Sequence, residues 1–159
     1  MTKQNESGRT MLEMLGVLGI MGIIMYGAVS GINYGMGTYK INQIYNDVQE
    51  QIQAVSDLYS WSRDYPGGDT MTKTACANDV FSRGCTSDQK AGLHPYGEGI
   101  TINQTDGGGS FSIQYSGIPQ DACLRLLEME WGMIDVSLLV GNTCASGSNT
   151  NTIIWKPQG

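Results

Sequence analysis

The sequence predicts an α+β fold in which a long N-terminal helix packs on a small antiparallel β-sheet head with disulfides. The first observation is an apolar segment at residues 14–32 that contains no charged residue. The second is a helical spacing of apolar residues that follows this segment. The third is a set of short runs after residue 99 that alternate between polar and apolar side chains, which is typical of an antiparallel sheet.

Length, charge and cysteine content limit the classes of function. A chain of 159 residues with one membrane-length segment leaves enough material for a single modest head. The formal net charge is −6 and no cluster of basic residues exists, so we expect no nucleic-acid binding. Four cysteines without a CxxC pattern, beside a single histidine, favour disulfides over a metal site. Disulfides need an oxidising compartment, so we expect the head outside the cytoplasm.

The apolar segment has the length of a membrane helix. Its 19 uncharged residues cover about 28 Å at the standard rise, close to the thickness of the hydrocarbon layer. The apolar core of a secretory signal peptide is shorter, at about 7–15 residues. The length therefore predicts a helix that is retained in the membrane.

Glycines recur along this predicted helix, and we assign them to helix packing. They are Gly16, Gly19, Gly22, Gly27, Gly31 and Gly35. The last three are spaced by four residues, which places them on one face and admits close approach of another helix. The alternative is that glycine is simply commoner in membrane helices than in soluble ones.

Glu13 is a carboxylate at the start of the apolar segment. A charged residue at mid-membrane costs about 2.5–3.5 kcal/mol, and the cost falls toward the ends of the helix. Glu13 is therefore tolerated but unfavourable unless a cation pairs with it. Arg9 stands four residues earlier, so an intrahelical salt bridge is one explanation.

The stretch Gly8-Arg9-Thr10-Met11-Leu12-Glu13-Met14-Leu15 resembles the prepilin motif of type IV pilins and related pseudopilins, and is most similar to the type IVb start. The resemblance implies that residues 1–8 are a leader, which a prepilin peptidase removes by cutting between Gly8 and Arg9. Glu13 then becomes the fifth residue of the mature chain. Arg9 departs from the Phe or Met that usually occupies the first mature position and becomes N-methylated.

The resemblance also gives Glu13 a role in assembly, together with Thr10. In the family, the carboxylate at this position is thought to attract the N-terminal amine of a subunit already in the filament. Such a carboxylate lies in an apolar filament core, where only a cation neutralises it. The resemblance thus implies that Glu13 sets the register of assembly.

The predicted helix continues beyond the membrane segment. Residues 9–35 form its transmembrane and filament-core part, and residues 36–65 form an amphipathic half of the same helix. The amphipathic half shows apolar residues at spacings of three and four, namely Ile41, Ile44, Val48, Ile52, Val55 and Leu58. Tyr65-Pro66-Gly67-Gly68 is the predicted stop.

Residues 66–159 form the predicted globular head with an antiparallel sheet. Residues 67–99 are polar and glycine-rich and read as a linker poor in sheet. Residues 100–104 and 110–115 alternate and flank Asp106-Gly107-Gly108-Gly109, which predicts a β-hairpin. We expect a helix from Pro119 to about Trp131, and two further strands at 134–140 and 152–156.

The cysteines allow three disulfide connectivities. Cys76 and Cys85 enclose eight residues, a plausible small disulfide loop. A bridge between Cys123 and Cys144 would tie the loop at 141–151 to the preceding helix. The resemblance favours this second pairing, because type IVb pilins carry a C-terminal disulfide with one cysteine in such a helix.

No catalytic constellation is expected. Asp121, Glu128, Glu130 and Asp135 suit a solvated helix face better than an acid–base pair. The 141–151 loop has no acidic residue for calcium, and the glycine-rich turn at 106–109 lacks a phosphate-loop ending. The three tryptophans, Trp61, Trp131 and Trp155, are expected in the core or at subunit contacts rather than in a ligand cage. We expect no enzyme, no cofactor and no metal.

The resemblance therefore implies a structural prepilin of a type IV pilus that serves adhesion, motility or transfer. Its expected partners are the prepilin peptidase, other pilin subunits and an inner-membrane assembly platform. The precursor is expected in a bacterial inner membrane with a periplasmic head, and the processed subunit in an extracellular pilus. The alternatives are a type II secretion pseudopilin and a signal-anchored periplasmic binding or enzyme domain.

Overall fold

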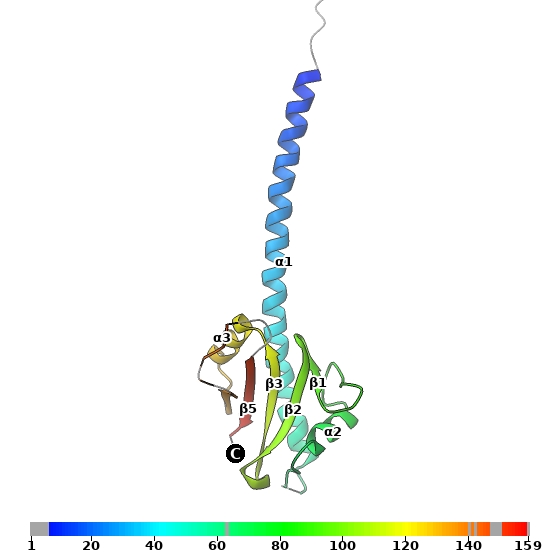
Figure 1. Cartoon of the computed structure of the whole chain (residues 1–159), viewed down its shortest axis with the longest axis vertical. Helices are drawn as coiled ribbons and strands as arrows, with labels where there is room; N and C mark the ends of the chain where they lie inside the picture. The colour runs from blue at the N-terminus through cyan, green and yellow to red at the C-terminus, as the bar shows by residue number, and fades with distance from the viewer. Residues whose placement is uncertain (1–6, 63, 140, 142, 147–150, 159) are drawn as a thin grey trace, which may run out of the picture. The chain divides into compact units, whose positions relative to one another are not determined.

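The computed structural model describes residues 7–62, 64–139, 141, 143–146 and 151–158. Its elements are α1 (Ser7–Leu58), α2 (Thr70–Ala77), β1 (Gly92–His94), β2 (Gly97–Thr105), the 3-10 turn η1 (Asp106–Gly108), β3 (Ser110–Ile118), α3 (Gln120–Glu128), β4 (Ile134–Leu138) and β5 (Asn151–Pro157) (Figure 1). The chain divides into two compact units, Met1–Tyr39 and Lys40–Gly159. The second unit is called the head below.

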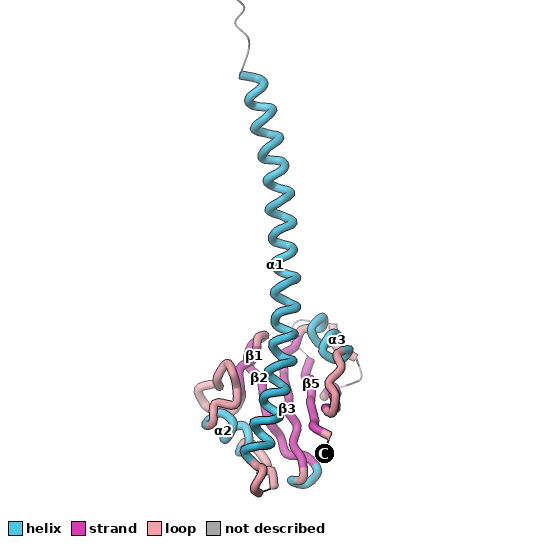
Figure 2. The backbone as a smooth tube through the Cα atoms, turned by 180° about the vertical axis from the view of Figure 1, so that it is seen from behind, coloured by secondary structure: helices cyan, strands magenta, loops and turns pink. Residues whose placement is uncertain are grey.

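Within the head, α1 packs against one face of the sheet (Figure 2). Its contact side is apolar because the predicted spacing places the apolar residues on one face of the helix. Four of them are buried, namely Ile41, Ile44, Val48 and Val55. Ile52 is partly buried against the same core. Leu58 is 38% exposed, so the packed side ends there.

The sheet has five antiparallel strands in the order β1-β2-β3-β5-β4. The last strand in sequence, β5, therefore lies between β3 and β4 (Figure 1). Side chains alternate along a strand, and this period of two turns one side of β3 and β5 toward α1. Ile113 pairs with Trp155 and Tyr115 pairs with Ile153, and all four are fully buried. These pairs form the centre of the core.

A buried hydrogen bond connects the helix to the sheet. The Tyr115 hydroxyl donates to Gln51 Oε1 at 3.0 Å, and both side chains are buried. Burial raises the pKa of Tyr115, with the carboxylate of Asp47 as the second cause, so the hydroxyl stays protonated and remains a donor. A buried polar group that lacked this partner would destabilise the head.

The predicted hairpin is confirmed. Ile102 of β2 pairs with Ile113 of β3, and the turn between the strands has positive φ at Asp106, Gly107 and Gly108. At Gly108, φ is 103° and an added Cβ would lie 2.5 Å from Asp64 Oδ1. The Gly108 carbonyl also accepts a hydrogen bond of 3.0 Å from the Tyr65 amide. Glycine is needed there both for its conformation and for this close approach.

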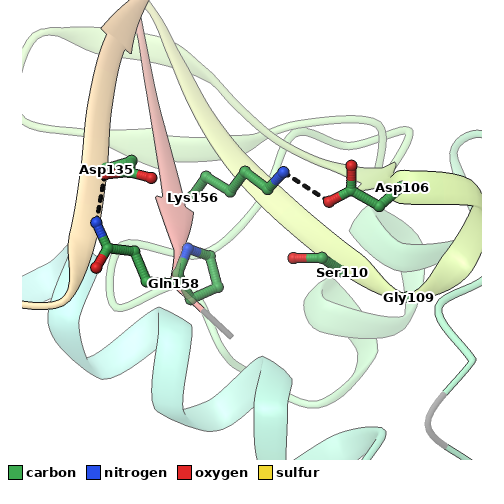
Figure 3. Close-up of a pocket in the computed structure, with 7 residues that line it drawn as sticks. Asp106, Gly109, Ser110, Asp135, Lys156 and Gln158 are labelled. Atoms are coloured by element: carbon green, nitrogen blue, oxygen red, sulfur yellow. Dashed lines mark hydrogen bonds and ion pairs between the residues drawn. The ribbon is translucent and has the colours of Figure 1, made fainter.

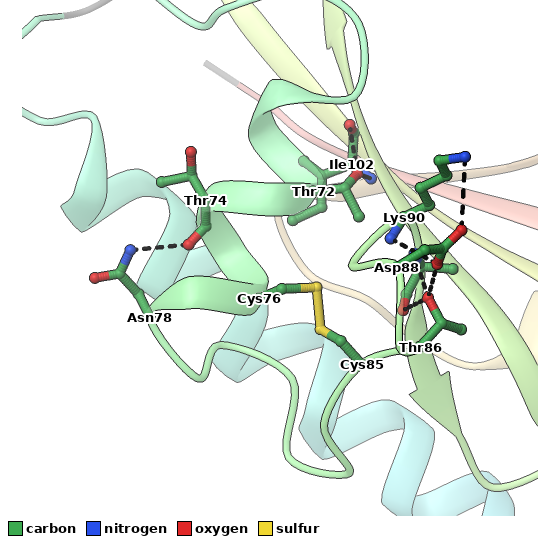
Figure 4. Close-up of a disulfide and its surroundings, with 10 residues drawn as sticks. Thr72, Thr74, Cys76, Asn78, Cys85, Thr86, Asp88, Lys90 and Ile102 are labelled. Carbon is green, nitrogen blue, oxygen red and sulfur yellow. Dashed lines mark hydrogen bonds and ion pairs between the residues drawn. A yellow bond between two sulfur atoms is a disulfide. The ribbon is translucent and has the colours of Figure 1, made fainter.

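Both disulfides form as expected. Cys76 is bonded to Cys85 and Cys123 to Cys144, with sequence separations of 9 and 21. By the loop-entropy model, closing loops of these sizes stabilises the fold by roughly 3 kcal/mol each. The first bridge connects α2 to the loop before β1 (Figure 4), and the second connects α3 to the loop before β5.

The segment at 67–99 is more ordered than predicted, because it contains α2, β1 and the start of β2. Three threonines in α2 weaken its helical propensity, so the sequence signal was poor. Tertiary contacts stabilise it instead. Thr72 Oγ1 donates to the Ile102 carbonyl at 3.3 Å and accepts from the Ile102 amide at 3.0 Å (Figure 4). Thr72 thereby provides hydrogen-bond partners for the backbone of Ile102, on the edge of β2 that the short β1 does not reach.

The predicted end of α1 at Tyr65 is wrong, because the helix ends at Leu58. Beyond this point, both the amide and the hydroxyl of Ser60 donate to the Asp57 carbonyl, at 3.3 and 2.9 Å. Serine competes for backbone acceptors in this way, so it ends the helix well before Pro66.

Other boundaries move by a few residues. The helix expected from Pro119 to about Trp131 is α3, which ends at Glu128. The indole of Trp131 donates to the Leu126 carbonyl at 2.8 Å, so a side chain takes the place of a further helical turn. The expected strands at 134–140 and 152–156 are β4 and β5, although residue 140 lies outside the described part of the chain.

Asp47 is a carboxylate of α1 that the head buries to 9% exposure. Its pKa is raised, chiefly by loss of solvent, against the opposing influence of a hydrogen bond from Ser82 and the charge of Arg83. A raised pKa in the folded state means that the folded chain binds this proton more tightly than the unfolded chain. The corresponding stabilisation is complete below the unfolded pKa and is lost as pH rises through the folded pKa.

We predict that Asp47→Asn makes the head more stable at pH 7, because it removes the cost of a buried charge. The advantage should shrink as pH falls and vanish below about pH 4, where the aspartate is protonated in both states. Urea unfolding of the variant and of the unmodified protein between about pH 3 and pH 7, the range in which Asp47 titrates, measures this stability difference. A stability difference that is constant over this range would contradict the prediction.

Candidate assembly surface

The first unit exposes an apolar helix surface on all sides. Every residue from 11 to 36 is exposed, and the large apolar side chains include Leu12 at 77%, Ile23 at 75% and Tyr26 at 78% exposure. The helix is long and apolar enough to cross a membrane. Full burial of one such side chain is worth about 1.5–3 kcal/mol. A surface of this size must be covered by lipid or by other apolar chains.

Glu13 lies on this surface beside Met14, Val17 and Leu18. Among the described side chains, the ion pairs are Lys90–Asp88 and Lys156–Asp106, and Glu13 belongs to neither. It is therefore a carboxylate surrounded by apolar side chains, in a setting that favours a cation from elsewhere.

The predicted cleavage site lies at the edge of the described chain. Gly8, Arg9 and Thr10 lie in the first turns of α1. The side chains of Arg9 and Thr10 are outside the described part, and so is any Arg9–Glu13 pair. Residues 1–6 of the predicted leader are outside it as well. Processing after Gly8 and the assembly role of Thr10 stay predictions.

The helix separates the predicted packing glycines into two groups. Each residue turns the helix by about 100°, so Gly31 falls in line with Glu13, and Gly27 and Gly35 fall within about 40° of it. Gly16 is about 60° away, whereas Gly19 and Gly22 are about 120° and 180° away. A Cβ at any of the six would meet nothing within 4 Å. The Glu13 face therefore carries most of the positions where another backbone could approach closely.

A polar cleft of about 410 Å³ lies on the head between η1, β4 and the end of β5 (Figure 3). Lys156 Nζ is 2.6 Å from Asp106 Oδ2, and Gln158 Nε2 donates to Asp135 Oδ1 at 2.6 Å. These contacts connect the C-terminal strand to the hairpin turn and to β4. Gly109, Ser110 and Pro157 complete the lining.

The acidic residues considered for catalysis are dispersed. Asp121, Glu128, Glu130 and Asp135 are all exposed, as on a solvated surface. Within the described residues, no group of three His, Cys, Asp or Glu side chains could hold a metal ion. The single histidine is structural: buried His94 places Nε2 at 2.8 Å from the Ser116 carbonyl and stacks on Tyr115 at 5.2 Å.

The three tryptophans differ in environment. Trp131 and Trp155 are buried, with ring centroids 5.3 Å apart, in agreement with the expected core role. Trp61 is 98% exposed, so it is not a core residue. No local pattern separates Trp61 from the other two tryptophans, because its exposure depends on where α1 ends.

The N-terminal helix, the small antiparallel sheet and the two disulfides define a type IV pilin-like architecture. A family model described as PilS N terminal matches residues 38–156. The chain belongs to this family of type IV pilin domains, and the class is that of structural subunits that assemble with other pilin subunits. The match covers the head and excludes the apolar surface. A search of curated proteins found no match.

We predict that residues 40–159 fold without the first unit, because the core draws only on residues of the head. This fragment should be soluble without detergent and form both disulfides. Its thermal midpoint should lie within about 3 °C of that of the full chain in detergent micelles. Circular dichroism measures the thermal midpoint, and mass spectrometry of the oxidised fragment measures the two disulfides. Aggregation of the fragment would contradict the prediction.

Proposed function

We propose that this chain is the precursor of a type IV pilus subunit, cleaved after Gly8 and polymerised through α1. The observation that carries the proposal is the exposed apolar surface of residues 11–36, with the Glu13 carboxylate at its beginning. Lipid can cover this surface before assembly, and other copies can cover it afterwards. Transfer of this surface from lipid to contacts with other copies would drive polymerisation.

Cleavage would give the assembly step its second charge. Hydrolysis of the peptide bond between Gly8 and Arg9 leaves a free amine on Arg9. In an apolar surrounding, an ammonium group of one subunit and the Glu13 carboxylate of another neutralise each other, whereas either charge alone is strongly unfavourable. Docking in the wrong register leaves both charges unpaired. The pair therefore selects one axial position between neighbouring helices.

The glycines on the Glu13 face would let neighbouring helices approach. Gly27, Gly31 and Gly35 follow Glu13 on the same side of α1, and each has open space where a Cβ would lie. Helices without a hydrophobic driving force between them associate through close packing at such small residues. Under this proposal, charge fixes register and the glycine face supplies the contact.

The head would remain on the surface of the filament. Its two disulfides and its antiparallel sheet suit a domain that folds in an oxidising compartment. We place the precursor in the inner membrane with the head in the periplasm. The prepilin peptidase and an assembly platform would act on it in this membrane. The Cys123–Cys144 bridge, similar to that of type IVb pilins, favours a pilus subunit over a secretion pseudopilin.

We predict that Glu13→Ala lowers the yield of sheared surface filaments by about tenfold or more, because a buried amine loses its partner. The matched control is Glu50→Ala, which removes an exposed glutamate from the same helix and should leave the yield unchanged. Both variants should still insert into the membrane. Equal yields from Glu13→Ala and the unmodified chain would reject this role of Glu13.

Mass spectrometry of the protein from cells with the peptidase tests processing separately. The mature chain should begin at Arg9 and lack residues 1–8. An intact Met1 would instead indicate a signal-anchored periplasmic domain.

A further inference from the structure

Trp61 is an exposed apolar knob on the head. It lies in the turn that follows α1 and is 98% exposed, whereas the other two tryptophans are at 5% and 0%. Ser60 and Ser62 flank it, and their hydroxyls donate to the carbonyls of Asp57 and Tyr59, at 2.9 and 3.4 Å. The turn thus holds the indole outward. Tryptophan is among the residues that contribute most to binding at protein interfaces.

The same head has a groove between α1 and the residues that precede β4. Its volume is about 420 Å³, and its apolar lining consists of Tyr45, Ile52, Trp131, Met133, Ile134 and Pro157. Met133 is 70% exposed at this position. Pockets of about 300–1,000 Å³ accommodate drug-sized ligands, so the volume of this groove is sufficient for one indole.

Charge points to a second copy of the chain as the occupant. Two identical subunits with a formal charge of −6 repel each other, so they make contact most readily where neither carries charge. None of the residues that line the groove is charged, and the knob stands between two serines. The groove is also formed in part by α1, the helix whose first half is the proposed assembly surface.

We propose that Trp61 of one copy inserts into this groove of a second copy, an inference that rests on the proposed function. The knob and the groove are different patches of one head, since Trp61 follows the last groove residue of α1, Gln53, by eight positions. Two heads that exchange knobs reciprocally form a closed dimer, whereas a contact made in one direction is heterologous and, when it does not close into a ring, repeats along a filament. The proposed contact is of this heterologous kind. The head would contribute its own specific link between subunits, besides the α1 contacts.

Cysteine crosslinking in sheared filaments tests the contact with Trp61 retained. The variant Ser62→Cys/Gln53→Cys places one thiol beside the knob and one on the exposed rim of the groove. Mild oxidation should give a ladder of dimers, trimers and larger species, because every copy donates a knob and accepts one. The control variant Ser62→Cys/Leu124→Cys, with a thiol on the exposed α3 position outside the groove, should give no ladder.

Trp61→Ala in the crosslinking variant measures the indole itself. We expect the ladder to weaken by roughly tenfold, as for truncation of an interface anchor. The thermal midpoint should not change, because the side chain is exposed.

Filaments that form but give no ladder, or give the same ladder without the indole or with Leu124→Cys, would overturn the contact and leave the proposed function intact. That outcome would assign the groove to another protein or a small molecule. Failure of the unmodified chain to form filaments, in cells with the peptidase and platform, would overturn both proposals.

Discussion

The structure depends on one constraint, which is that the apolar surface of residues 11–36 cannot remain in water. Each of its residues is exposed. Burial of this surface is energetically favourable, so it stabilises any apolar surrounding that covers the helix. The head, in contrast, has a buried core formed by its own residues.

These two units divide the work of a pilin along a single helix. The first half of α1 is apolar on all sides, as a membrane segment requires, and the second half is apolar only on the side that faces the sheet. Tyr115 and Gln51 add a buried hydrogen bond between sheet and helix. The helix α1 runs from Ser7 to Leu58, so it contributes residues to both the assembly surface and the core of the head.

Charge has different roles in the two units. In the first unit, Glu13 lies beside Met14, Val17 and Leu18, where a carboxylate favours a cation as its partner. Under the proposed contact between heads, the net negative charge of the chain disfavours the approach of identical heads except at uncharged patches. The groove beside Trp131 is such a patch. Apolar attraction and charge repulsion together restrict how copies of this chain can meet.

The sequence by itself determined the elements whose signals are local. Uncharged length predicted the membrane segment, spacing predicted the burial of Ile44 and Val48, and alternation predicted the β2–β3 hairpin. Only the tertiary structure decided the place of β5 between β3 and β4, the Thr72 contact that stabilises α2, and the exposure of Trp61. Each of these depends on pairing or packing between residues far apart in the chain, or on where a helix ends. Local patterns carry no information about such contacts, because their energy arises only when the distant partners meet.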